Sequence, residues 1–422
     1  MKRSQKSEIK THNIDSASAM FLLNSIDWRF STPFSVGRSG IRLFDCRKHH
    51  WYPATFIPEI PYTLIEILSE PGARILDPFA GIGTTIFQAI MLGRVPYGVE
   101  LCPVTVHLMH CLWRLFAGLK PELSVDKYAA DYCARYCEDK DYVKRILKQR
   151  PSFEKLQPWF EQSTFQQLAF IALLELQTKE PVVNSAIEVA FSSTLKAVCA
   201  QDRGWGCIAD NVLPKPKQTH QIKDAIGRFR RNLSILTNEI LKAKISLDKR
   251  TSLLLERHSP EEHIFLNDSK LDIPVEDSSI DLVVTSPPYP SMTDYSTSQR
   301  LSHYWLGYDP AQFIPQEIGA RRKRTKSDAL LSYTSDMTAV FKIVSQKVVK
   351  RGFVCLVMPR FEGSKHNNGL RKQAVEECLA ALPGYGFVRE GELTRFLPER
   401  RRHHNQCWAK LQREDILVFR RI

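Results

Sequence analysis

Cysteine is scarce in this 422-residue chain, and its ten cysteines form no Cys-x-x-Cys pair. Neither a disulfide framework nor a zinc ribbon is therefore indicated, and we expect reduced, mostly buried thiols. No run approaches the roughly 18 uninterrupted apolar residues that a membrane helix needs. Residues 1–16 are polar and lack the apolar run of a signal peptide, so we expect a cytoplasmic protein.

The overall composition excludes a disordered, collagenous or fibrous chain, because 43% of the residues are apolar and 25% are charged. The length predicts two or three domains, or one large domain with an insertion. Lys and Arg outnumber Asp and Glu by 59 to 46, which gives a formal charge of +13. Such an excess favours a polyanionic partner, since each Lys or Arg placed on a phosphate releases a condensed counterion.

The basic residues gather in three segments, 215–231, 321–326 and 400–404. Solvated surface loops are the alternative interpretation, but we favour contacts with nucleic acid. The candidate residues are Arg228, Arg230, Arg231, Arg321, Arg322, Lys323, Arg324, Arg400, Arg401 and Arg402.

Residues 61–101 predict a β-α-β unit. A helix over 62–68 is followed by a short apolar strand that stops at Asp77, a turn with Gly81 and Gly83, a helix over 84–92 and a strand over 96–99. Glycines at a strand-to-helix turn let the backbone approach a ligand closely.

Helical spacing takes over between about 119 and 261, most clearly where Ile222, Ile226, Phe229, Leu233, Leu236 and Ile240 recur at intervals of four and three. The α/β pattern then resumes, with strands expected over 263–266, 281–285, 352–358, 387–397 and 415–420 and a helix over 370–382. We therefore predict an α/β fold with seven mostly parallel strands, covered by helices on both faces and interrupted by a helical insertion.

Polar signals follow four of the predicted strands: Asp77 with its glycine turn, Glu100, Asn267-Asp268, and Ser286-Pro-Pro-Tyr289. The carboxyl ends of parallel strands meet at one edge, so these signals should converge on one crevice. Glu100 would suit the two hydroxyl groups of a ribose. The glycine spacing differs from the G-x-G-x-x-G of dinucleotide-binding folds, which disfavours NAD.

Residues 77–85 read Asp-Pro-Phe-Ala-Gly-Ile-Gly-Thr-Thr, and residues 285–289 read Thr-Ser-Pro-Pro-Tyr. Both closely resemble motifs of the S-adenosylmethionine-dependent amino-methyltransferases of DNA, D-P-F-x-G-x-G-T-T and [S/N/D]-P-P-[Y/F]. The Ser variant is the one that this family associates with cytosine N4. Residues 49–68 resemble the family's tenth motif, a helix preceded by an F-x-P turn.

The resemblance implies a class I methyltransferase fold, which is Rossmann-like, and transfer of a methyl group from S-adenosylmethionine to cytosine N4 in double-stranded DNA. Base flipping is implied, as is a restriction-modification setting with a separate cognate endonuclease. The implied catalytic residues are Ser286, Pro287, Pro288 and Tyr289, with Tyr289 stacked on the base. The implied cofactor-binding residues are Phe56, Asp77, Pro78, Phe79, Ala80, Gly81, Gly83, Thr84, Thr85, Glu100 and Asp268.

The motif order resembles the alpha group, in which a target recognition region separates the cofactor half from the catalytic half. We therefore expect residues 1–118 to form the cofactor part, 119–261 the recognition insertion and 262–422 the catalytic part. Adenine-N6 methylation, RNA methylation and an inactive nucleic-acid-binding relic remain alternatives. Carbon-5 methylation is disfavoured, because the chain has no Pro-Cys dipeptide to supply a nucleophilic thiol.

Several residues have two interpretations. Asp77 organises the turn or binds the cofactor directly, and Asp268 contacts adenine or caps a loop. Cys133 and Cys137 lie one helical turn apart, but core thiols are a better interpretation than a metal cluster, and no metal is expected. Tyr295 is open between base pocket and packing, whereas Trp305 favours packing.

Overall fold

The computed structural model describes residues 15–29, 43–136, 141–201, 213–214, 222–321, 328–362, 368–397 and 411–422. Within these ranges no helix is long and apolar enough to cross a membrane. The basic residues Arg322, Lys323, Arg324, Arg400, Arg401 and Arg402 and the thiol of Cys137 lie outside the described ranges.

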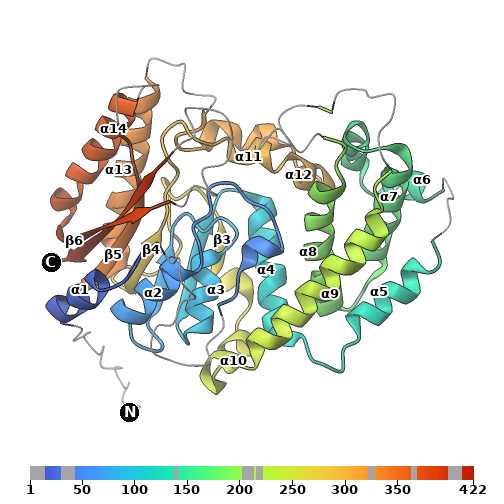
Figure 1. Ribbon diagram of the computed structural model, residues 1–422, viewed down its shortest axis with the longest axis horizontal. Coiled ribbons are helices and arrows are strands. Elements are labelled where there is room, and N and C mark those ends of the chain that lie inside the picture. The colour runs from blue at the N-terminus through green and yellow to red at the C-terminus, as the bar shows by residue number, and fades with distance from the viewer. Residues whose placement is uncertain are drawn as a thin grey trace, which may run out of the picture.

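The described chain is built around a seven-stranded sheet with the strand order β3-β2-β1-β4-β5-β7-β6 (Figure 1). All neighbouring strands are parallel except β7, which runs antiparallel to both β5 and β6. The predicted mostly parallel α/β class is therefore confirmed. The strands are β1 (Arg74–Asp77), β2 (Val95–Glu100), β3 (Ile264–Leu266), β4 (Ile280–Thr285), β5 (Val348–Arg360), β6 (Phe387–Phe396) and β7 (Arg413–Arg421).

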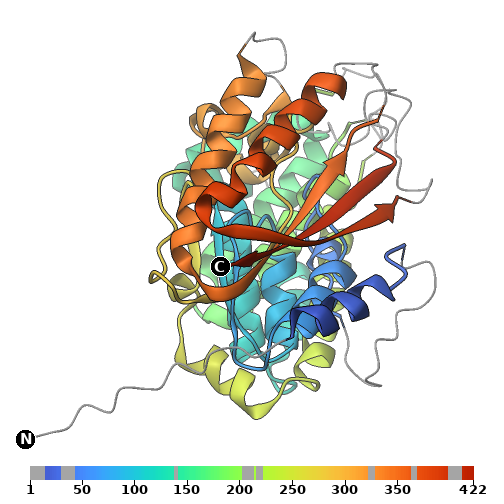
Figure 2. The ribbon, with the colours of Figure 1, turned by 90° about the vertical axis from the view of Figure 1, so that its left-hand side faces the viewer.

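Alternation along the central strands sends successive side chains to opposite faces of the sheet. Ile75 and Leu282 are paired in register and pack against α2 (Glu59–Leu68), whereas their neighbours Leu76 and Val283 pack against α13 (Ala329–Lys347). Helix α14 (Asn368–Ala380) joins α13, and α1 (Ser16–Asn24) joins α2. Figure 2 shows the orange and red helices α13 and α14 on one side of the strands and the dark blue α1 on the other.

Helix α3 (Thr84–Met91) and helix α4 (Pro103–Gly118) connect the sheet to an extended set of helices. Neither α4 nor α13 is among the helices that the sequence pattern predicts. The central part of α4 is buried around most of its circumference, so it shows no clear polar stripe.

Between residues 119 and 262 every described element is a helix, as the spacing of apolar residues predicts. The elements are α5 (Val125–Cys133), α6 (Asp141–Gln149), η2 (Pro151–Trp159), α7 (Gln162–Gln177), α8 (Pro181–Val198), α9 (Ala225–Lys244), α10 (Lys249–Arg257) and η4 (Pro260–Glu262).

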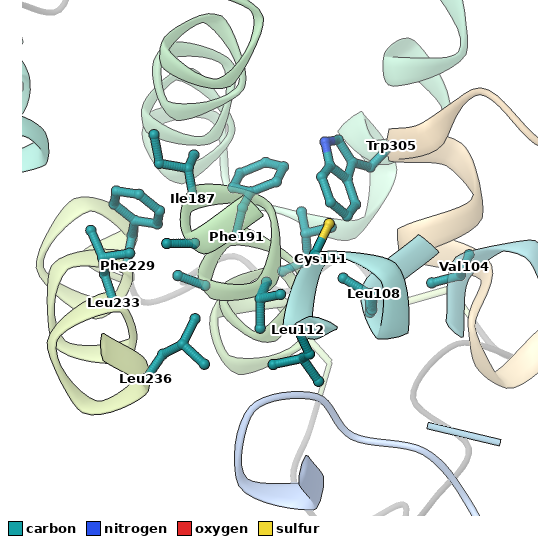
Figure 3. Packing of buried hydrophobic residues seen from close by; sticks show 14 of the residues in the cluster. Val104, Leu108, Cys111, Leu112, Ile187, Phe191, Phe229, Leu233, Leu236 and Trp305 are labelled. Carbon is teal, nitrogen blue, oxygen red and sulfur yellow. The ribbon is translucent and has the colours of Figure 1, made fainter. Parts of the chain in front are cut away.

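Helix α9 buries Phe229, Leu233, Leu236 and Ile240, as its periodicity predicts, but Ile222 lies outside the helix and is 65% exposed. The reason is local: the Asp224 carboxylate accepts the Gly227 amide at 2.8 Å and so caps the helix after Ile222. The buried stripe of α9 packs with α8 and α4 in one continuous hydrophobic cluster (Figure 3).

Two short helices, α11 (Tyr295–Ser298) and α12 (Arg300–Leu306), follow the Ser-Pro-Pro-Tyr segment and lead from the sheet toward α8 (Figure 1). Trp305 of α12 is fully buried, and its indole nitrogen donates to Glu175 at 2.8 Å. The predicted packing role of Trp305 is therefore confirmed.

Candidate active site

One cavity lies where β1, β2, β3 and β4 end, with about 820 Å³ of empty space when its open mouth is included. The four polar signals of the sequence therefore do converge at one edge of the sheet. The predicted residues that line it are Phe56, Pro78, Phe79, Ala80, Gly81, Thr84, Glu100, Asp268, Ser286 and Pro288.

Asp77 does not line the cavity but is buried beneath it, with 1% of its surface exposed. Its carboxylate accepts the Phe79 amide at 3.0 Å, the Thr85 hydroxyl at 2.7 Å and the Thr285 hydroxyl at 2.6 Å. Burial raises the pKa of Asp77 to about 6, although these hydrogen bonds oppose the shift. The geometry therefore assigns Asp77 and Thr85 to the framework of the turn, joining the ends of β1 and β4.

The turn after Asp77 requires glycine at two positions. Gly83 has a φ of +88°, and a Cβ there would lie 2.9 Å from the sulfur of Met109. Gly81 has a φ of +55°, and its ideal Cβ would face the ring of Tyr52 at 3.4 Å. Gly83 thus serves the packing of α3 without lining the cavity, whereas Gly81 keeps the cavity wall free of a side chain.

Glu100 ends β2 and divides its two oxygens between backbone amides. Oε2 accepts Gly81 N at 2.7 Å, and Oε1 accepts Cys102 N at 2.9 Å. Burial is the largest influence and raises the pKa of Glu100 to about 7. Each oxygen retains further acceptor capacity, so an ionised Glu100 can hold hydroxyl donors from a ligand.

Asp268 combines the two interpretations that its sequence position allows. One carboxylate oxygen accepts the Lys270 amide at 3.0 Å, which caps the loop, and the side chain also lines the cavity. Lys270 Nζ lies 3.6 Å from the other oxygen. Asn267 lies beside Asp268 in the cavity wall, so carboxylate and amide groups meet at the end of β3.

The Ser-Pro-Pro-Tyr segment begins directly after β4, but only Ser286 and Pro288 line the cavity. Pro287 is buried, and Tyr289 is only 7% exposed. The Tyr289 hydroxyl donates to Glu414 of β7 at 3.0 Å and lies 3.4 Å from the Ser286 hydroxyl. The Tyr289 ring therefore does not line the cavity in this geometry, and its stacking on a base stays a prediction.

Aromatic surface in the cavity comes instead from Tyr52 and Tyr295. Their rings stack with centroids 5.7 Å apart. Tyr295 combines both interpretations, because it lines the cavity and also packs against the hydrophobic core. The sequence pattern does not single out Tyr52, although Tyr52 precedes Phe56 within the segment that resembles the tenth motif.

Glu317 is a second residue that the sequence pattern did not single out. It lines the cavity, is 3% exposed, and accepts the Ser296 amide. Its surroundings in sequence, Pro315 to Gly319, carry no periodic or motif signal, so only the fold could locate it.

Of the predicted nucleic-acid contacts in described parts of the chain, Arg228, Arg230 and Arg231 are exposed on α9, and Arg321 is partly buried. Arg228 lines a second pocket, near the first one, together with Arg47, Lys48 and Lys196.

The seven-stranded sheet and the cavity at its carboxyl edge define a Rossmann-like methyltransferase fold. Residues 15–109 match the model of a family described as DNA methylase. This match supports the resemblance to the family over a range that contains residues 77–85 but not residues 285–289. DNA methyltransferases of the family use S-adenosylmethionine.

Two relatives are similar to the chain over longer stretches. Type II methyltransferase M.BsoBI of Geobacillus stearothermophilus is 24% identical over 279 residues, which cover 62% of this chain and 53% of that protein. Type II methyltransferase M.MvaI of Kocuria varians is 23% identical over 339 residues, which cover 73% of this chain and 70% of that protein. The chain thus spans about half the length of M.BsoBI.

The donor set of the cavity fits S-adenosylmethionine. Glu100 offers acceptors for hydroxyl groups, Asn267 and Asp268 offer polar contacts for a base, and Gly81 leaves room where a Cβ would intrude. A cluster of the partly exposed His107 with the buried Cys111 and Glu188 lies elsewhere, between α4 and α8, and these side chains contact one another through hydrogen bonds and an ion pair.

Proposed function

We propose that this protein is a DNA methyltransferase that transfers a methyl group from S-adenosylmethionine to the N4 amine of cytosine. The observation that carries the proposal is the convergence of Ser286 and Pro288 with Gly81, Glu100 and Asp268 on one cavity. The proposed catalytic loop, Ser-Pro-Pro-Tyr, and the proposed cofactor-binding edge of the sheet thus share one cavity. The Ser-Pro-Pro-Tyr form of the loop favours cytosine N4 over adenine N6.

In this proposal the cofactor supplies an electrophilic methyl group. Glu100 accepts hydrogen bonds from the ribose hydroxyls, and Asp268 accepts one from the adenine amine. Phe79, Ala80 and Gly81 contact the methionine portion, next to the start of α3. Phe56 and Thr84 complete the wall.

The target amine is a poor nucleophile, because its lone pair is conjugated into the ring. Catalysis must orient the amine and accept its hydrogens as the nitrogen becomes tetrahedral. The proposed acceptors are the Ser286 hydroxyl, which lines the cavity, and the Pro287 carbonyl, which lies between the lining residues Ser286 and Pro288 in the rigid di-proline turn. No nucleophilic cysteine is needed.

The base must leave the duplex to reach this cavity, which costs a few kcal/mol of stacking and pairing. The stacked pair Tyr52 and Tyr295 offers an aromatic surface that restores part of that cost. The helical insertion, residues 119–261, is the proposed target recognition region, on the evidence of its position and its basic residues. A cognate restriction endonuclease acting on the same site belongs to the same proposal.

Product analysis tests the proposal. The purified protein is incubated with S-adenosylmethionine and unmethylated DNA, and the DNA is digested to nucleosides for mass spectrometry. We expect N4-methyldeoxycytidine. N6-methyldeoxyadenosine would overturn the choice of base, a product on RNA alone would overturn the choice of polymer, and no product on either polymer would favour an inactive binding protein.

Ser286→Ala should lower kcat by about 100-fold or more, because the proposed loss of one preorganised acceptor acts on the transition state. Binding of S-adenosylhomocysteine, measured by isothermal titration calorimetry, should remain within about twofold of wild type. A variant that methylates DNA at the wild-type rate would contradict the proposed role of Ser286.

A further inference from the structure

A second pocket lies between the segment that precedes the cavity and the helical insertion. It is lined by residues 47–51, by α8 and α9, and by residues 299–302. Its basic side chains come from three separate parts of the sequence: Arg47 and Lys48, Lys196 of α8, and Arg228 of α9. Only the fold brings these cations together.

Among the described residues that line this pocket, none carries a carboxylate. Arg47 pairs with Asp45 at 2.7 Å and Lys48 with Glu239 at 3.0 Å, and both acids lie outside the lining. Lys196 lies against the ring of Trp51 in a cation–π contact. Because acids balance Arg47 and Lys48, the positive charge offered to a ligand comes mainly from Lys196 and Arg228.

The floor of the pocket is polar and held by hydrogen bonds. Ser192 contacts His50 at 2.9 Å and Ser302 at 3.1 Å, and the other ring nitrogen of His50 lies 2.8 Å from Gln299. Burial lowers the pKa of His50 to about 4, so the imidazole is neutral at pH 7 and the positive charge of the pocket comes from Lys and Arg.

Asn232 of α9 adds an amide at the junction of the two insertion helices. Its Nδ2 donates to Ser193 at 2.8 Å and to Thr194 at 3.0 Å, which ties α9 to α8 beside Arg228 and Lys196. Both Nδ2 hydrogens of Asn232 are thus used within the protein, so the groups of this pocket that bind phosphate oxygens are its Lys and Arg side chains.

The basic pocket adjoins the cavity along the chain. Trp51 lines the pocket and Tyr52 lines the cavity, so the boundary falls between adjacent residues. The two linings also come close at the end of α11, where Ser296 lines the cavity and Gln299, three residues later, lines the pocket. A strand that places a base in the cavity can therefore pass its backbone close to these cations.

We propose that this basic pocket binds a backbone phosphate of the DNA strand that carries the target base, next to the flipped nucleotide. The proposal rests on the proposed function, which it extends by naming the group that fixes the strand beside the cavity. Arg228 was a candidate from charge alone. The structure adds Lys196 and distinguishes Arg228 from Arg230 and Arg231, which do not line the pocket.

The test compares a double variant in the pocket, Lys196→Gln with Arg228→Gln, with a matched control on α9, Arg230→Gln with Arg231→Gln. Both remove two positive charges from the full-length protein. Fluorescence anisotropy with a labelled duplex gives Kd across a salt series. We expect the pocket variant to lose about tenfold or more in affinity at low salt and to flatten the slope of log K against log salt by roughly one to two, with a smaller change in the control.

S-adenosylhomocysteine binding should remain unchanged in both variants, because neither changes a residue of the cavity. A pocket variant whose DNA affinity and salt slope match those of the control would overturn the proposal. So would a pocket variant that loses S-adenosylhomocysteine binding, because the pocket would then support the fold or the cavity.

A second measurement identifies the source of the phosphate. Once the target sequence is mapped, duplexes with a neutral methylphosphonate at single positions flanking the target base are compared. Wild type should lose affinity at one such position, and the pocket variant should be insensitive there. A thermal shift with inorganic phosphate alone, with no methylphosphonate effect, would assign the pocket to a free anion and overturn the strand proposal.

Failure of the proposed function can be distinguished from failure of the phosphate pocket, because the function is tested with the wild-type protein. Wild type that forms no methylated nucleoside on DNA would refute the proposed function. Wild type that methylates DNA while the pocket variant keeps normal affinity would refute the phosphate pocket alone.

Discussion

The Glu100 carboxylate serves both the backbone and the cavity. It accepts the amides of Gly81 and Cys102, and burial places its pKa at about 7, within the working range of most enzymes. The ionised form accepts hydrogen bonds at both oxygens, whereas the protonated form loses part of this capacity. Its protonation state should therefore control how well the cavity holds a ribose.

We expect the affinity for S-adenosylhomocysteine to fall about tenfold between pH 8 and pH 6. A pKa raised to about 7 leaves Glu100 ionised above that pH and protonated below it, so binding to the ionised form weakens as pH falls. Titration calorimetry across this range is the measurement. Glu100→Gln should bind more weakly at pH 8 and show a flatter profile, which separates Glu100 from the titration of the ligand itself. A wild-type affinity that is constant from pH 6 to pH 8 would contradict the assignment.

At the scale of single elements, α9 links the insertion to the rest of the molecule. One face is buried against α8 and α4 (Figure 3). The opposite face carries exposed arginines. The buried face fixes the orientation of the helix and therefore where Arg228 lies. A substitution that removes a side chain from the buried face should lower the free energy of unfolding. A substitution on the exposed face should change it little.

Phe229→Ala should lower the free energy of unfolding by about 3 to 5 kcal/mol, because Phe229 is fully buried and its removal leaves a cavity. Ile235→Ala on the same helix is the matched control, since Ile235 is 43% exposed, and should cost less than about 1 kcal/mol. Urea denaturation measures both. Equal losses in the two variants would refute the packing described for α9.

At the scale of the whole molecule, the helical insertion shares its hydrophobic core with the part that forms the cavity. Ile86 and Phe87 of α3 belong to the same cluster as Leu112 of α4 and Phe229 of α9. Residues on both sides of the insertion boundary therefore share one core and lose their packing together when the chain unfolds. The stability of the insertion is thus coupled to that of the part that forms the cavity.

Scanning calorimetry should show one unfolding transition. A saturating amount of S-adenosylhomocysteine should shift that whole transition upward, since a ligand at 100 times its Kd adds about 2.7 kcal/mol to the native state. The calorimetric and van't Hoff enthalpies should agree. Two transitions, of which only one responds to the ligand, would show that the insertion unfolds independently.

The sequence alone determined the elements whose signals are local. The strand that stops at Asp77, the turn with Gly81 and Gly83, and the stripe from Phe229 to Ile240 each reflect spacing along one short segment. Parallel strands then required that the ends of β1 to β4 meet, so the cavity and most of its lining followed from the same pattern.

Only the tertiary structure decided which side chains face that cavity and which support it. Asp77 lies beneath the cavity because hydroxyls from two strands converge on it, and Tyr289 lies behind the loop because Glu414 of a distant strand holds its hydroxyl. Glu317 and Lys196 carry no local signal at all. Contacts between residues far apart in sequence have no periodicity, so their positions depend on packing of the complete chain.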